Sequence, residues 1–91
     1  MKVAYIRVSS AEQNEVRQVE ALEKYGIEKW FVEKISGKNT NRPKLKEMLA
    51  FVREGDTIHI HDLSRLARST SDLLIIVENF NSQGINLVSN G

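Results

Sequence analysis

Arginine and serine side chains gather in this sequence at the points where predicted strands end. Ser9 and Ser10 directly follow the first apolar run, and four of the six arginines lie near the ends of such runs: Arg7, Arg42, Arg65 and Arg68. The seven lysines are scattered along the chain instead. A guanidinium presents a planar fork of donors that matches phosphate oxygens, which the compact ammonium of Lys does not. The pattern indicates a phosphate group held beside a hydroxyl nucleophile.

The serines and the loop arginines also have ordinary structural explanations. Serines at a helix start are most often caps, so position alone favours that role for Ser9 and Ser10. Arg65 and Arg68 fit a solvated loop, and Arg42 fits the surface of a helix start. Residue types and spacing by themselves therefore predict only a phosphate-binding domain.

Arg7, His59 and His61 lie within predicted strands, where a buried polar group needs a partner. Arg7 lies in a strand predicted to be covered on both faces, where a charge without a partner is costly. A salt bridge to Glu33 and a functional role explain that position about equally well. His59 and His61 share one face of the third predicted strand with apolar residues opposite, which predicts a half-exposed strand. Two histidines at i and i+2 without a third ligand make a weak metal site.

The elements that must position these residues follow from hydrophobic periodicity. Short apolar runs predict strands over residues 2–8, 30–35, 57–61 and 85–89. Stretches of helical periodicity lie between them, beginning near residues 9–10, 43 and 71, and each ends at or before a glycine. The order β-α-β-α-β-α-β predicts one α/β domain with three layers, in which flanking helices cover a mostly parallel, flavodoxin-like sheet. In open parallel sheets, ligand sites form outside the carboxyl ends of the strands, so the fold brings the serines and arginines to one edge.

Local signals mark the helix starts and the faces they bury. Glu12 and Gln13, three residues after the serine pair, complete a capping-box pattern. Pro43 suits the first turn of the second helix, and Ser71 or Asp72 is expected to cap the third. The buried face of the first helix is predicted from its apolar spacing: Val16, Val19, Leu22 and Tyr25.

Composition limits the class of protein. Ninety-one residues with 41% apolar and 27% charged content are ordinary for one small globular domain. No apolar run reaches the ~18 residues of a membrane helix, the N-terminus does not resemble a signal peptide, and there is no cysteine. We therefore expect a cytoplasmic protein. Because the net charge is only +1, binding of nucleic acid would depend on positive charges clustered on one face or on another segment of the protein.

Three segments of the chain resemble a known family. Tyr5-Ile6-Arg7-Val8-Ser9-Ser10, followed by Gln13, resembles the N-terminal signature of the resolvase/invertase family of serine site-specific recombinases. Ser36-Gly37 with Arg42 is similar to the family's second-loop signature. Gly55-Asp56 and Leu63-x-Arg65-Leu66-Ala67-Arg68 are similar to its third. The segments occur in the family's order and spacing, so the resemblance spans essentially the whole chain.

The resemblance implies a mechanism for DNA strand exchange. Ser9 would attack the scissile phosphorus, displace the 3′-oxygen and leave a 5′-phosphoseryl link, which the 3′-hydroxyl later reverses. Gln13 would position the phosphate or the hydroxyl. The developing negative charge would be stabilised by the arginines: Arg7, Arg42, Arg65 and Arg68. Supporting roles would fall to Tyr5, Glu33, Ser36 and Ser64.

The same resemblance implies partners and the absence of cofactors. Exchange of one phosphodiester for another needs no nucleotide cofactor, and no metal is expected. The substrate would be double-stranded DNA, bound by homodimers that pair into tetramers, with no membrane partner. Residues 1–91 would be a catalytic domain truncated before a dimerisation helix and a helix-turn-helix DNA-binding domain, encoded in a prokaryote or a mobile element. The isolated chain would then be poorly active, because the later segments bring most of the DNA affinity.

Two departures from the family pattern and three rival functions stay open. Ser64 stands where many members carry an acid, with Asp62 nearby, and His59 replaces a common apolar residue. The general base for Ser9 is not assigned. The rivals are a catalytically silent regulator, a nucleotide-binding module and a metal-dependent nuclease. The second lacks a glycine-rich first turn and the third lacks clustered acids, whereas intact Ser9 and the four arginines argue against the first.

Overall fold

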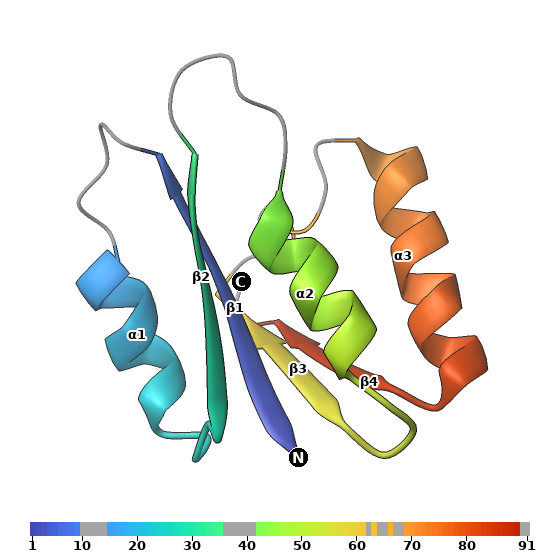
Figure 1. Ribbon diagram of the computed structural model, residues 1–91, viewed down its shortest axis with the longest axis horizontal. Helices are drawn as coiled ribbons and strands as arrows, with labels where there is room; N and C mark the ends of the chain where they lie inside the picture. Colours follow the sequence, from blue (N-terminus) through green and yellow to red (C-terminus); the bar gives the residue numbers. More distant parts are fainter. Residues whose placement is uncertain (10–14, 36–41, 62, 64–65, 67–68, 90–91) are drawn as a thin grey trace.

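Strands and helices alternate along the whole chain (Figure 1). The computed structural model describes residues 1–9, 15–35, 42–61, 63, 66 and 69–89, with only the backbone at residues 9 and 35. The strands are β1 (Lys2–Ser9), β2 (Lys29–Ile35), β3 (Thr57–Ile60) and β4 (Asn86–Ser89). The helices are α1 (Glu15–Glu23), α2 (Pro43–Phe51) and α3 (Thr70–Gln83). The predicted order of elements is confirmed.

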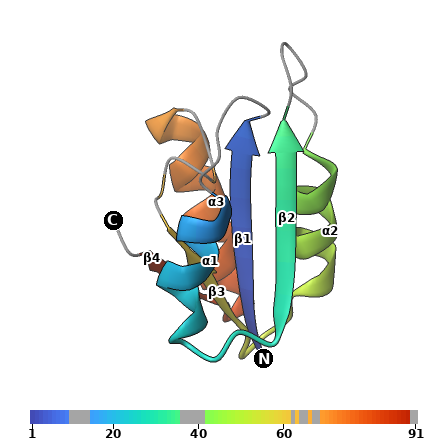
Figure 2. The same cartoon turned by 90° about the vertical axis from the view of Figure 1, so that its left-hand side faces the viewer.

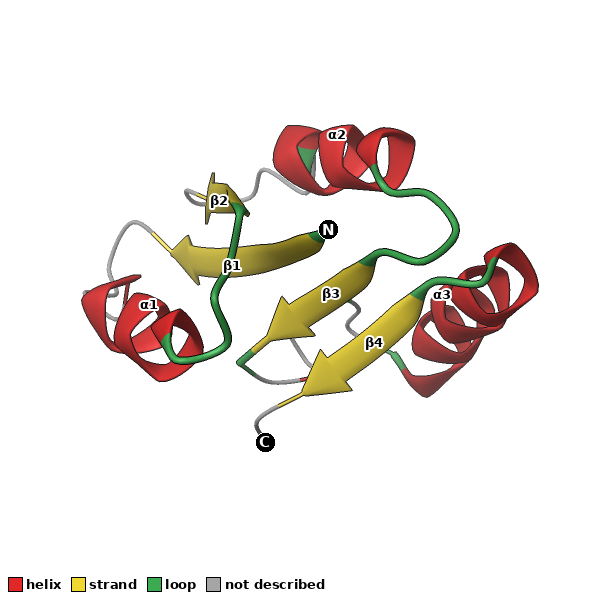
Figure 3. Cartoon of the chain, turned by 90° about the horizontal axis from the view of Figure 1, so that it is seen from below, coloured by secondary structure: helices red, strands yellow, loops and turns green. Residues whose placement is uncertain are grey.

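The four strands form one parallel sheet in the order β2-β1-β3-β4. Helix α1 covers one face of this sheet, and α2 and α3 cover the other (Figure 3). The predicted three-layer, flavodoxin-like arrangement is therefore confirmed. β1 pairs with β2 as far as Ser9 but with β3 only as far as Tyr5, so its carboxyl end extends beyond β3.

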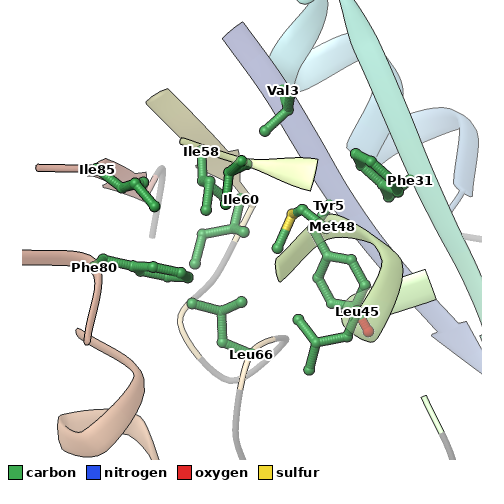
Figure 4. Packing of buried hydrophobic residues seen from close by; sticks show 11 residues of the cluster. Val3, Tyr5, Phe31, Leu45, Met48, Ile58, Ile60, Leu66, Phe80 and Ile85 are labelled. Atoms are coloured by element: carbon green, nitrogen blue, oxygen red, sulfur yellow. The ribbon is translucent and has the colours of Figure 1, made fainter. Parts of the chain in front are cut away.

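Apolar side chains of β1 are buried on both faces of the sheet. Val3 and Tyr5 join the larger cluster under α2 and α3, in which Met48 and Phe80 contribute from the helices (Figure 4). Ala4, Ile6 and Val8 pack against Leu22 of α1 on the opposite face. Burial on both faces explains why the sequence of this central strand is an almost continuous apolar run.

The helix ends show which local signals decide the boundaries. Pro43 is the first residue of α2, as predicted. The predicted cap of α3 is wrong: the hydroxyl of Ser69, and not Ser71 or Asp72, accepts a hydrogen bond from the Asp72 N–H at 3.2 Å. Ser71 lies inside the first turn, and Asp72 supplies the N–H that needs a cap. Gly84 ends α3 with φ 73°, a left-handed conformation that favours glycine.

The predicted buried face of α1 is also partly wrong. Val16 is 64% exposed, whereas Gln18 and Leu22, one helical turn apart, are buried. The face that α1 turns to the sheet therefore includes a glutamine in place of the first valine.

At the amino end of the sheet, hydrogen bonds link the N-terminus and the turns that precede the strands. The N-terminal amine binds the Asp56 carboxylate at 3.0 Å, and the Met1 carbonyl accepts from the Thr57 N–H at 2.9 Å. The Asp56 carbonyl accepts from Asn86, and the Gly84 carbonyl accepts from Gly55, both at 3.0 Å. Figure 2 shows the N-terminus at this end, opposite the arrowheads of β1 and β2.

The prediction that β3 is half exposed is wrong. Ile58 and Ile60 are fully buried in the larger cluster, and His59 on the other face is only 4% exposed. The ring of Tyr25, in the turn after α1, stacks on the His59 imidazole with 4.6 Å between centroids. This stack covers a histidine that sequence periodicity places at the surface.

Candidate active site at the carboxyl ends of the strands

The topology places a crevice beside the end of β1. After β1 the chain passes to α1 on one face of the sheet, and after β3 it passes to α3 on the other (Figure 3). Chain departure in opposite directions between adjacent strands is the switch point where open α/β sheets bind ligands. Ser9 is the last residue of β1, so the predicted nucleophile lies in sequence at this point.

Glu33 lies buried beside Arg7 in the register of the sheet. The two residues are direct Cα partners of β1 and β2, and Glu33 is 3% exposed. One Glu33 carboxylate oxygen accepts from the backbone N–H groups of Lys44 at 3.0 Å and Leu45 at 3.3 Å. Arg42, at the N-cap position, supplies no side-chain cap to α2. Glu33 therefore caps α2 from the neighbouring strand, a function that the sequence did not reveal.

Arg42 joins the start of α2 to the loop after β3. Its Nη1 donates to the carbonyl of Leu66, and its own carbonyl accepts from the Lys46 N–H at 3.1 Å. Leu66 is fully buried and belongs to the core cluster under α2 and α3 (Figure 4). In sequence, Arg65 and Arg68 lie one and two residues away from this buried leucine.

Tyr5 lies between these charged groups. Its ring is buried beside Met48 and Leu45 (Figure 4), and its buried hydroxyl has no hydrogen-bond partner among the described residues. Burial raises the pKa of Tyr5 to about 12, although the positive charges of Arg42 and Arg7 oppose that rise. The hydroxyl thus stays protonated at neutral pH. Arg7 is the Cα partner of Glu33, and Glu33 binds the first turn of α2 directly after Arg42, so both arginines lie at this end of the sheet.

Gln18 is a residue that the sequence analysis missed. It is 1% exposed, and its Nε2 donates to the backbone carbonyl of Arg7 at 3.3 Å. This bond supports β1 where the strand has passed the end of β3. Gln18 Oε1 is buried and finds no partner in the described part of the chain. Its position four residues before Leu22 is the sequence signal that places it on the buried face of α1.

The remaining predicted site residues cannot be placed. The side chain of Ser9 lies outside the described part of the structure, as do Gln13, Ser36, Ser64, Arg65 and Arg68. Of the predicted set, the structure brings together Arg7, Arg42, Tyr5 and Glu33. Within the described ranges, no three His, Asp or Glu side chains form a group that could hold a metal ion, and no helix is long and apolar enough to cross a membrane.

Comparison with known proteins identifies the family. The family model described as "Resolvase, N terminal domain" matches residues 2–90. The chain belongs to the resolvase family. It is 43% identical over 86 residues to the transposon Tn501 resolvase of Pseudomonas aeruginosa, and 45% identical over 89 residues to a DNA-invertase of Enterobacteria phage P7.

These alignments cover different shares of the two chains. They include 94% and 98% of this resolvase-family chain but only 45% and 48% of the two relatives. The chain thus spans about half the length of the curated relatives it matches.

Solved structures confirm the resolvase-family fold. The C-terminal catalytic domain of an IS607-like serine recombinase superimposes with a TM-score of 0.78 at 26% identity, covering 99% of this chain and 67% of that one. A serine recombinase from Sulfolobus solfataricus superimposes with a TM-score of 0.80 and the same coverage, at 24% identity. The second likeness concerns the fold alone.

Proposed function

We propose that this chain is the catalytic domain of a serine site-specific recombinase, which cleaves and rejoins double-stranded DNA through a 5′-phosphoseryl intermediate on Ser9. The observation that carries the proposal is that Glu33 links Arg7, its partner on the neighbouring strand, to the start of α2 where Arg42 lies, at the end of the sheet where β1 ends at Ser9. Family membership and the recombinase names of its relatives support the same reaction.

The described residues explain how a phosphate would be held there. Arg7 comes from a strand fixed on one side by β2 and supported by Gln18, and Arg42 is held against the loop after β3. Donors that are already oriented need little reorganisation when charge develops on the phosphoryl oxygens. Arg65 and Arg68 would complete the set, and Gln13 would orient the attacking hydroxyl or the phosphate.

Tyr5, Glu33, Ser36 and Ser64 are proposed as supporting residues. Glu33 fixes the first turn of α2, and through it the position of Arg42. One serine cuts one strand, so a double-strand exchange between two sites requires four copies. Homodimers that pair into a tetramer would supply them.

A covalent-capture experiment tests the proposal. Supercoiled plasmids carrying genomic fragments are incubated in EDTA with the full-length protein that would contain this domain, and the reaction is stopped with denaturant. We expect protein linked to the 5′ end of a cut strand, no linkage with Ser9→Ala, and retained linkage with Ser10→Ala as the matched control.

The alternative outcome would favour a different function. DNA binding without any adduct in the unaltered protein would indicate a catalytically silent regulator that retains the fold. An adduct that persists in Ser9→Ala would remove Ser9 from the mechanism.

A further inference from the structure

His59 is a buried imidazole in apolar surroundings. It is 4% exposed, and neither ring nitrogen has a hydrogen-bond partner in the described part of the chain. Its Cα partners are Ala4 on β1 and Val88 on β4, and its ring stacks on Tyr25 at an interplanar angle of 27°. A neutral imidazole carries one donor and one acceptor, whereas the charged form carries two donors. The site therefore offers nothing that would stabilise a second proton.

The charge that acts directly on this ring is that of Lys2, which opposes its protonation, while α1 on the same face carries Glu15, Arg17, Glu20 and Glu23. Lys2 lies on β1, and the Lys24 ammonium lies 5.3 Å from the centroid of the Tyr25 ring. The Glu28 carboxylate already accepts from the Lys2 backbone N–H at 2.9 Å. Among the described residues of the histidine's own segment, the other titratable groups are His61 and Asp56, whose carboxylate binds the N-terminal amine and the Arg53 N–H; β4 carries none. Helices α2 and α3 pack on the opposite face.

We propose that His59 is a pH-sensitive latch for α1: when the imidazole gains a proton, it leaves the stack with Tyr25, and the turn after α1 separates from the sheet. Tyr25 forms the outer half of this contact, and its covering of the ring excludes water. Because Gln18 on the same helix holds the Arg7 carbonyl, separation of α1 also removes a support of β1. The latch does not depend on the proposed DNA chemistry, although its effect on catalysis does.

The direction of the pH dependence follows from the site. Burial, and then Lys2, lowers the pKa of His59 below its ordinary value of 6.5. The open form takes up the proton more readily, so docking of α1 is strongest above pH 6.5 and weakens as the pH falls below it. Each unit by which the pKa is lowered corresponds to a tenfold change in the opening equilibrium.

Hydrogen exchange measured by NMR between about pH 7.5 and pH 5 tests this inference, with rates corrected for intrinsic exchange. In the unaltered chain we expect protection of the α1 amides to fall on acidification while β1 and α2 stay protected. His59→Phe keeps a ring for the stack and should abolish the change. His61→Phe is the matched control and should retain it.

Three results would overturn the proposal. They are an unchanged pH response in His59→Phe, a uniform loss of protection over all elements, and α1 protection that does not vary with pH in the unaltered chain. If His59→Phe does not fold, His59→Leu makes the same comparison with a smaller apolar side chain.

Discussion

The amino and carboxyl ends of this sheet differ in how far side chains hold them. At the amino end, backbone groups of consecutive turns bind one another, as from Thr57 to Met1 and from Gly55 to Gly84, and the Asp56 carboxylate adds side-chain bonds among these turns. At the carboxyl end, the connections run through side chains: Glu33 to the start of α2, Arg42 to the loop after β3. Backbone bonds tolerate many residue types, whereas side-chain bonds do not. Substitutions at the carboxyl end should therefore alter activity first, and those at the amino end stability.

The largest expected effect is on the cleavage rate, and it is tested by making the same Arg→Lys change at each end of the sheet. Arg42→Lys keeps the charge but loses the fork that binds the Leu66 carbonyl and, in our proposal, the phosphate. We expect adduct formation to slow by about 100-fold or more, the usual loss for one transition-state donor. Arg53→Lys, near the amino end, should leave the rate unchanged. Equal rates for the two variants would contradict the comparison, as measured by single-turnover cleavage.

Glu33 tests whether the carboxyl end also contributes to stability. Glu33→Ala removes the acceptor for two N–H groups of α2 and should lower the free energy of unfolding by about 1 kcal/mol, as loss of a helix cap does. Glu33→Gln keeps an oxygen acceptor and should lose less. The control is Glu47→Gln, whose exposed pair with Lys44 should contribute little. Urea unfolding measures all three, and a Glu33→Ala variant as stable as the control would exclude the cap.

The smallest effect is expected at Asp56. Hydrogen bonding from the Arg53 N–H, and then from the N-terminal amine, lowers the pKa of Asp56 below its ordinary value of 3.8. Its carboxylate therefore stabilises the folded state above that pH, and this stabilisation is lost as the pH falls below it. Asp56→Asn should be slightly less stable at neutral pH, with unchanged cleavage. The difference in urea midpoint between the two proteins should be larger at about pH 7 than at about pH 3; an equal difference at both would show that charge is not involved.

Much of the fold was predictable because its signals are local. Apolar runs, Pro43 and Gly84 mark element boundaries, since each acts through its own backbone or its immediate neighbours. The alternation of elements then leaves few parallel topologies. The misplaced cap of α3 shows the limit of such signals, because the four residues from Ser69 to Asp72 all have side chains that can cap a helix, and only the point where the helix begins decides among them.

The sequence by itself determined the family, the α/β fold and the identity of the expected reacting groups. Its signature residues Tyr5, Arg7 and Ser9 occupy alternate positions of one strand, so their expected chemistry can be inferred without knowing what lies beside them. The tertiary structure decided three other matters: that Glu33 caps α2, that Gln18 supports Arg7, and that His59 is buried. Each depends on contact between residues that are at least eleven positions apart in the chain. Periodicity assigns a side chain to a face, but only packing shows which group from another element meets it there.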